Sequence, residues 1–248
     1  MNDTAIEQTL SGGHVLWTFD GQQPLGPPFW SRLCELARDI TLESQSVTLY
    51  GGGDFGPGTD LAWLTRELRR AQRGDATRSL ASAGEPARAA LKCLSALPVP
   101  TVALCSGDIV GASAELAVAA DFRWCIGRAT IRFPEAQLGL LPDFVGIGQL
   151  LNALGPQDTR RALMGQEEIT ASVSTPSPFF DHYAATREEA LEAIRRYTDG
   201  CARGDVLIEL RKCLTRTVAQ PATVSSLTNE RIASIDDVIR AVHRMAEL

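Results

Sequence analysis

Residues 97–125 read LPVPTVALCSGDIVGASAELAVAADFRWC, and residues 131–155 read IRFPEAQLGLLPDFVGIGQLLNALG. The proline-rich PVP segment ends one helix, and the apolar run TVALCSG predicts a buried strand that ends at a glycine turn. The alanine-rich run from about Ala112 predicts a buried helix, and FRWCIGRATIRF predicts strand, turn and strand. A loop with Pro134 and Pro142 then leads to a helix near residues 145–154. Short strands therefore alternate with helices here.

The flanking segments continue this alternation. Upstream, HVLWTF (residues 14–19) and SVTLYGG predict strands, and apolar residues at helical spacing predict helices over residues 29–40 and 61–73. We expect Pro86 to start a further helix, because proline is favoured in the first turn. Downstream, three helices are predicted over residues 187–201, 205–218 and 229–247. The pattern indicates an α/β core over residues 1–185 and a helical region over residues 186–248.

Composition narrows the class of protein. The chain has 248 residues and a formal net charge of -6, which argues against a nucleic-acid surface. It has no apolar run long enough to cross a bilayer, and its polar, acidic start does not resemble a signal peptide, so we expect a cytoplasmic protein. The six cysteines are scattered, and we expect them to be small core residues rather than disulfides. The three histidines lie far apart, so no metal site is expected.

Two segments carry a resemblance to a known family. DFGPGTDL (residues 54–61) follows a strand and is similar to the motif Phe-x-Ala-Gly-x-Asp-Leu of the crotonase (enoyl-CoA hydratase/isomerase) superfamily. Residues 97–155 resemble that family's Pro-x-Pro strand, its Gly-Gly-Gly-x-Glu-Leu helix start and its Phe-x-x-Pro-Glu-x-x-x-Gly-x-x-Pro loop. The ordered set is more specific than any fragment. The chain is identified as a divergent member of this superfamily.

The resemblance implies a fold and a class of substrate. The fold is a crotonase-type spiral of β-β-α units whose C-terminal helical region serves trimerisation or covers the site. The substrate is an acyl-CoA or acyl-carrier-protein thioester, so coenzyme A or phosphopantetheine enters as part of the substrate, and no separate cofactor or metal is implied. We expect a homotrimer or a hexamer, with no nucleic-acid or membrane partner.

An oxyanion hole is the first part of the implied site. Chemistry at the α-carbon of a thioester places negative charge on the carbonyl oxygen, and two backbone N–H donors stabilise it, each by about 3 kcal/mol. By position these donors are the amides of Thr59 and Ala112. A helix that begins near Ala112 also aims its positive dipole end at the charge. The other implied substrate-binding positions are Phe55, Pro57, Gly58, Asp60, Gly111 and Asp143. Taken alone, GGGDFGPG fits a tight loop equally well, and GAS fits a close-packed helix start equally well.

Glu115 and Glu135 are the implied catalytic residues. In hydratases of the family, glutamates at both matching positions flank the double bond, where one activates water and the other supplies a proton. Structural alternatives exist, because Glu115 in a first helical turn can stabilise the helix, and Glu135 can be a solvated loop acid. Asp143 stands where many hydratases have glycine, and a carboxylate in this loop is similar to the isomerase branches.

Departures from the family pattern keep other functions open. Pro57 replaces the usual alanine, and FDGQQPLGPPFW lacks the arginine that typical members carry before their first helix. The leading prediction is an enoyl thioester hydratase or dehydratase. The second is another enolate reaction, double-bond isomerisation or decarboxylation. The third is a non-catalytic partner subunit in a biosynthetic pathway.

Overall fold

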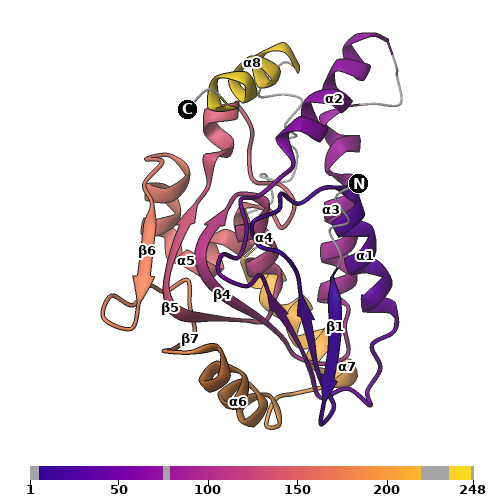
Figure 1. Cartoon of the computed structure of the whole chain (residues 1–248), viewed down its shortest axis with the longest axis vertical. Coiled ribbons are helices and arrows are strands. Elements are labelled where there is room, and N and C mark those ends of the chain that lie inside the picture. Colours follow the sequence, from indigo (N-terminus) through magenta and orange to yellow (C-terminus); the bar gives the residue numbers. More distant parts are fainter. Residues whose placement is uncertain (1–5, 75–78, 219–234, 247–248) are drawn as a thin grey trace.

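A computed structural model describes residues 6–74, 79–218 and 235–246. Its centre is a seven-stranded sheet in the order β1-β2-β3-β4-β5-β6, with β7 paired to β5 (Figure 1). Strands β2 to β5 run parallel to one another, whereas β1 and β6 pair antiparallel at the two edges. The strands are β1 (Glu7–Ser11), β2 (His14–Thr18), β3 (Ser46–Tyr50), β4 (Thr101–Val110), β5 (Phe122–Arg132), β6 (Ile169–Ser172) and β7 (His182–Ala184).

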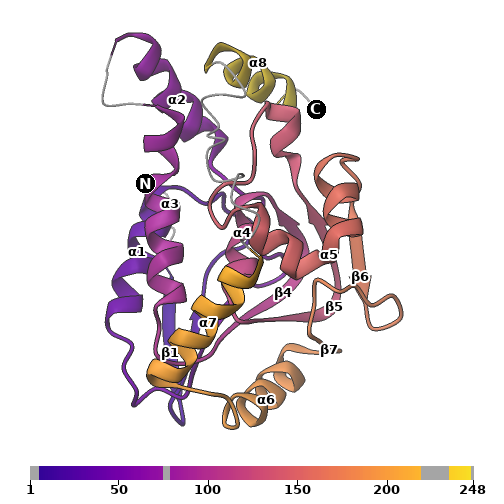
Figure 2. The ribbon, with the colours of Figure 1, turned by 180° about the vertical axis from the view of Figure 1, so that it is seen from behind.

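Helices cover this sheet and close one end of the molecule. They are α1 (Pro27–Arg38), α2 (Leu61–Gln72), α3 (Leu80–Ser95), α4 (Ala112–Ala119), α5 (Ile147–Leu163), α6 (Arg187–Thr198), α7 (Gly204–Val218) and α8 (Ile235–Ala246), with the 3-10 helix η1 (Pro134–Leu138). Helices α1 and α3 lie side by side, and α8 lies over α2 and η1 (Figure 1). Seen from behind, α5 and α7 cover the sheet (Figure 2). None of the described helices is both long and apolar enough to span a membrane.

Helix α4 is the most buried helix near the site, and its sequence explains why. Small alanines let it pack against β4, α3 and α5, and every residue from Ala112 to Val118 is buried. The positive φ of Gly111 (50°) turns the chain from β4 into this helix. The first turn of α4 is therefore fixed in the core, directly after the central strand.

The predicted alternation of strands and helices is confirmed, with two corrections: FRWCIGRATIRF forms the single strand β5 rather than two strands and a turn, and α3 starts earlier than predicted. Of the helix predicted over residues 229–247, residues 229–234 and 247 lie outside the described residues. Helix α3 begins at Leu80, six residues before Pro86, which lies inside it. Ser79 accepts from the backbone N–H of Ser82, and the Ser82 hydroxyl accepts from the N–H of Ser79. This capping box starts the helix early and outweighs the one backbone hydrogen bond that proline cannot donate.

The expectation that no cysteine forms a disulfide is also wrong. Cys34 in α1 and Cys93 in α3 form a disulfide with a Cα–Cα distance of 5.6 Å. The two residues are 59 positions apart, and only the packing of α1 on α3 brings them together. Cys105 and Cys125, by contrast, are free and buried, as small core residues are.

Candidate active site

The loop after β3 and the start of α4 lie against each other. Gly56 forms a parallel bridge with Ile109, and its N–H donates to the carbonyl of Asp108 at 2.9 Å. Two residues on, the N–H of Gly58 donates to the Ser113 hydroxyl at 3.1 Å. The chain segment that ends in Thr59 therefore runs beside the segment that ends in Ala112.

Gly58 is required for this close approach. Its φ is +91°, and a Cβ there would lie 2.6 Å from the carbonyl oxygen of Val110 and 3.6 Å from the backbone nitrogen of Ala112. A side chain at this position would push the two segments apart. Glycine thus places the residue before Thr59 next to the amide that begins α4.

A buried pocket of about 140 Å³ opens at this junction. All predicted site residues except Phe55 and Asp60 line it: Pro57, Gly58, Thr59, Gly111, Ala112, Glu115, Glu135 and Asp143. The rest of the wall is mostly apolar and includes Leu61, Trp63, Leu64, Leu138, Leu140, Leu141 and Phe144. Two carboxylates that the sequence separates by twenty positions therefore share one largely apolar cavity with the two predicted oxyanion donors.

Phe55 and Asp60 support the loop rather than line the pocket. The Phe55 side chain is fully buried and meets the ring of Phe19 edge to face at 5.5 Å. The Asp60 carboxylate accepts from the N–H of Trp63 at 2.8 Å and caps α2. These two contacts fix both ends of the segment that carries Thr59.

Glu115 is a buried carboxyl held by two backbone amides. Its side chain is in the first turn of α4, and its Oε2 accepts from the N–H of Phe144 at 2.8 Å and of Val145 at 2.9 Å. Burial and the neighbouring Glu135 raise the pKa of Glu115 well above its ordinary value, Asp143 adds to the rise, and the two amides oppose it. Both amides bind the same oxygen, Oε2, of a residue that lines the pocket.

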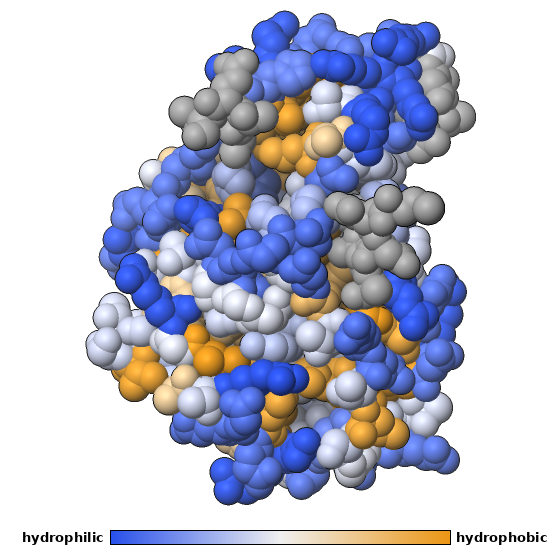
Figure 3. Space-filling view, viewed as in Figure 1, coloured by the Kyte–Doolittle hydropathy of each residue, from blue (hydrophilic) through white to orange (hydrophobic). Residues whose placement is uncertain are grey.

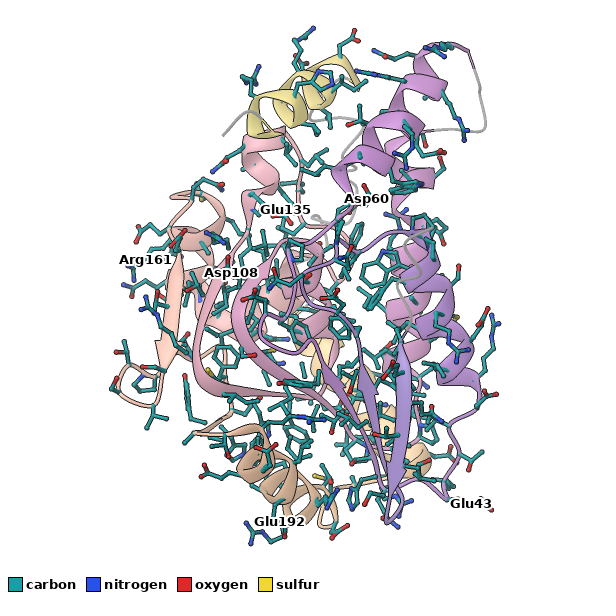
Figure 4. The ribbon with its side chains drawn as sticks, in the orientation of Figure 1. Glu43, Asp60, Asp108, Glu135, Arg161 and Glu192 are labelled. Atoms are coloured by element: carbon teal, nitrogen blue, oxygen red, sulfur yellow. A yellow bond between two sulfur atoms is a disulfide. The ribbon has the colours of Figure 1, made fainter. Side chains whose placement is uncertain are left out.

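Glu135 enters the pocket from η1. Burial, together with a smaller effect of Asp143, raises the pKa of Glu135 to about 7, while a hydrogen bond from the backbone of Glu135 itself opposes the rise. Its Oε2 is buried without a hydrogen-bond partner within the described part of the chain. In Figure 4, Glu135 lies between η1 and the segment that leads into α2, where Asp60 is labelled. A buried acceptor oxygen without a partner is costly, which marks Oε2 of Glu135 as a candidate functional atom.

The glycine at position 111 makes room for Glu135. A Cβ at Gly111 would lie 2.9 Å from Oε1 of Glu135, closer than real Cβ atoms approach. The Glu135 carboxyl therefore reaches the backbone at the entry to α4, where the predicted donor Ala112 begins the helix. The pocket thus combines two carboxyls whose pKa values are both raised with the backbone positions Thr59 and Ala112, which suits transfer of a proton to and from a bound substrate.

Apolar side chains close the far end of the pocket. Helix α8 buries Val238, Ile239, Ala241 and Val242 against Leu64 and Leu68 of α2 and Leu138 of η1. Figure 3 shows apolar side chains gathered below α8, between α2 and η1. Leu64 and Leu138 belong both to this cluster and to the pocket wall, so the pocket ends in a hydrocarbon-like environment.

Sequence reasoning missed several residues that shape the site. The amides of Phe144 and Val145 bind Glu115, and Arg88 of α3 forms an ion pair with Asp143 at 3.3 Å. No motif marks Arg88, which lies in an amphipathic helix outside the two segments that resemble the family's motifs. Only the packing of α3 against the 139–146 loop makes it part of the site.

Three comparisons relate this chain to known proteins. The sequence model of the enoyl-CoA hydratase/isomerase family matches residues 47–174. A trans-2-decenoyl-[acyl-carrier-protein] isomerase of Streptococcus mutans is 36% identical over 141 residues, which are 54% of this chain and 51% of the isomerase. A probable enoyl-CoA hydratase of Mycobacterium tuberculosis is 29% identical over 161 residues, which are 62% of this chain and 58% of that protein. The chain spans about half the length of the curated relatives it matches.

Solved structures agree with the fold. An enoyl-CoA hydratase of Bacillus halodurans superimposes with a TM-score of 0.75 at 16% identity, covering 96% of this chain and 99% of that one. An enoyl-CoA hydratase/isomerase of Mycobacterium paratuberculosis gives 0.77 at 15% identity, covering 97% and 98%. At such low identity these structures establish the architecture, and the family model adds the sequence signature of the site-bearing half. The chain therefore belongs to the enoyl-CoA hydratase/isomerase family, as a divergent member with the crotonase fold.

Proposed function

We propose that this chain is an enzyme that adds water to an α,β-unsaturated acyl thioester, or removes it in the reverse direction. The observation that carries the proposal is the shared pocket: Glu115 and Glu135 line the same apolar cavity as Thr59 and Ala112. A single buried acid would suit several reactions, whereas addition of water needs an acid and a base on one face of the double bond.

The proposed step is as follows. One glutamate takes a proton from a water molecule, and the water oxygen forms a bond to the β-carbon. The electron pair of the double bond moves toward the thioester carbonyl, whose oxygen gains negative charge between the amides of Thr59 and Ala112. The other glutamate then gives its proton to the α-carbon, so the sum of the steps is one added water. We assign the two glutamates to these roles as a pair, because groups this close titrate together.

The wall of the pocket supports an acyl substrate. Trp63, Leu64, Leu138 and Leu140 offer an apolar surface to a hydrocarbon chain, and burying each methylene contributes about 0.8 kcal/mol. Among the relatives, the mycobacterial protein is named for a CoA thioester and the streptococcal isomerase for an acyl-carrier-protein thioester. We therefore propose a thioester substrate on one of these two carriers.

The experiment follows the absorbance of a conjugated enoyl thioester, which hydration removes. We expect turnover by the wild type, and losses of ~10²-fold or more for Glu115→Gln and for Glu135→Gln, because an amide cannot exchange a proton in this way. The losses should not add in the double variant, since both groups serve one transition state. The matched control is Glu35→Gln, a surface glutamate in α1, which should retain wild-type turnover.

Isomerisation is the second candidate, and one observation favours it. Asp143 places a third carboxyl in the pocket, and a relative that is 36% identical over 141 residues is an isomerase. An isomerase would move the double bond without gaining oxygen, and would depend strongly on one glutamate and weakly on the other. If the isolated chain turns over none of the thioesters but alters the activity of a second protein that copurifies with it, it is a partner subunit and the proposal fails.

A further inference from the structure

We propose that the ion pair between Arg88 and Asp143 is a positioning device for the glutamate pair, which fixes the loop that holds Glu115 and keeps a third carboxylate beside both glutamates. The inference deepens the proposed function and rests on it for the catalytic consequence. The expected effect of the ion pair on the pKa values of the two glutamates does not depend on the proposed function.

The first argument is how the loop between η1 and α5 is held. Residues 139–146 begin and end at glycines with positive φ, Gly139 (70°) and Gly146 (82°). Between them, Phe144 and Val145 donate their amides to Oε2 of Glu115. One residue earlier, Asp143 meets Nη1 of Arg88 at 3.3 Å. The loop is therefore tied to α4 on one side and to α3 on the other by three consecutive residues.

The second argument is that Arg88 is itself fixed. Its guanidinium also contacts Glu85 of the same helix at 3.3 Å and the carbonyl of Ala81, and its side chain is 20% exposed. A Cβ at Gly84 would lie 2.5 Å from Nη1 of Arg88 and 3.1 Å from the Phe144 ring. Glycine at position 84 therefore lets the guanidinium and the ring approach each other. An arginine that is held by several contacts keeps its partner in a fixed position, whereas a surface cation without such contacts rotates freely.

The third argument is electrostatic. Three carboxyls line the pocket, Glu115 from α4, Glu135 from η1 and Asp143 from the loop. After burial, Asp143 is among the groups that raise the pKa of Glu115 and of Glu135. Among the described residues, Arg88 forms an ion pair with Asp143 and also contacts Glu85, while Asp60 is engaged as the cap of α2. The charge that the glutamates experience thus depends on both members of the pair.

The two members should therefore act in opposite directions. Asp143→Asn removes a negative charge from the pocket and should lower the apparent pKa values of the glutamate pair. Arg88→Met removes the positive charge that offsets Asp143 and should raise them. A change of about half a pH unit or more is expected in each case, because charges a few ångströms away in a partly dry site act strongly. If the ion pair only held the loop in place, both variants would be less stable than the wild type. The pKa values of the glutamate pair would then not shift in opposite directions.

The test is a titration of the carboxyl groups of the full chain, monitored by infrared or carbon NMR spectroscopy. The pH profile of kcat/KM is measured as a second readout. We expect the apparent pKa values of the glutamate pair to shift in opposite directions in Asp143→Asn and Arg88→Met. We also expect kcat to fall about tenfold in Arg88→Met with little change in KM, because the variant loses the positioning of the catalytic groups. Arg88→Lys keeps the charge, so its titration should stay near that of the wild type.

The matched control is the exposed pair Arg32–Glu35 of α1, at 3.2 Å, whose variants Arg32→Met and Glu35→Gln should leave the titration unchanged. Shifts in the same direction for Asp143→Asn and Arg88→Met, or no shift in either, would overturn the inference. The titration needs no turnover, so failure of the proposed function appears separately, as inactive wild-type protein with the opposite shifts intact.

Discussion

At the scale of single residues, the glutamate pair links stability to function. The folded protein raises the pKa of Glu135 from 4.5 to about 7, so the folded state binds this proton more tightly than the unfolded state. The contribution of the protonated group to the free energy of unfolding is complete below pH ~4.5 and is lost as the pH rises through ~7. A buried carboxylate is thus a cost that the protein bears at working pH, as functional sites often do.

Replacing this group should therefore stabilise the protein at alkaline pH. We predict that Glu135→Gln raises the free energy of unfolding at pH 8 by up to ~3 kcal/mol, because about 2.5 pKa units of ionisation cost are removed. The gain should be absent near pH 4.5 and should appear between pH 4.5 and 7. Chemical denaturation at several pH values measures it. A variant less stable than the wild type at pH 8 would show that the Glu135 carboxylate is favourably bound in the folded state.

The same residues show how far sequence reasoning reaches. The resemblance of DFGPGTDL and GASAEL to motifs of the family implied a common site for Thr59, Ala112 and Glu115, and all three line one pocket. The bond between Glu115 and the amides of Phe144 and Val145 joins residues about thirty positions apart. Neither the sequence spacing nor the residue types indicate it, since any residue supplies an amide. Arg88 was missed for a related reason: its partner Asp143 is 55 positions away.

At the scale of secondary-structure elements, α3 connects the core to the site. Its C-terminal half carries Arg88 and Cys93, which is bonded to Cys34 of α1, and its N-terminal half carries the pocket residues Ala83 and Gly84. The sequence predicts only its second half, because proline favours a helix start at Pro86, whereas the capping box at Ser79 starts the helix earlier. A single helix thus spans the distance from the disulfide to the pocket.

Reduction of the disulfide should weaken this helix pair. For a loop closed by residues 59 positions apart, the chain-entropy argument gives at most about 4 kcal/mol of stability. We predict that Cys34→Ser, or a reductant, lowers Tm by several degrees. Cys201→Ser is the control, because Cys201 is free and should leave Tm unchanged. Equal Tm values for oxidised and reduced protein would contradict the presence of the bond in solution.

At the scale of the whole molecule, α7 presents exposed apolar side chains beside a groove. A broad groove of about 1000 Å³ lies between α7 and the α4–β5 turn, and it is lined by apolar residues such as Leu207, Leu210 and Val118. Val206, Leu210 and Leu214 are exposed, and a row of large apolar side chains along one helix is typical of an interface.

We propose that this face is covered by further copies of the chain, in a trimer or a hexamer. Light scattering at micromolar concentration should give three or six times the mass of 26.7 kDa. Leu210→Lys should reduce the mass toward that of one chain, whereas Leu42→Lys, at an exposed leucine that does not line the groove, should not. A monomeric wild type would contradict the proposed assembly and leave the pocket as described.

The most direct test of the proposed function is the product formed in isotope-labelled water. The purified chain is incubated with a conjugated enoyl thioester in water that carries heavy oxygen, and the product is analysed by mass spectrometry. If Glu115 and Glu135 act as proposed, the product gains one molecule of water, with the heavy oxygen on the β-carbon, and Glu135→Gln forms it ~10²-fold more slowly. A product that contains no heavy oxygen, with the double bond moved or the thioester unchanged, would contradict the hydratase account.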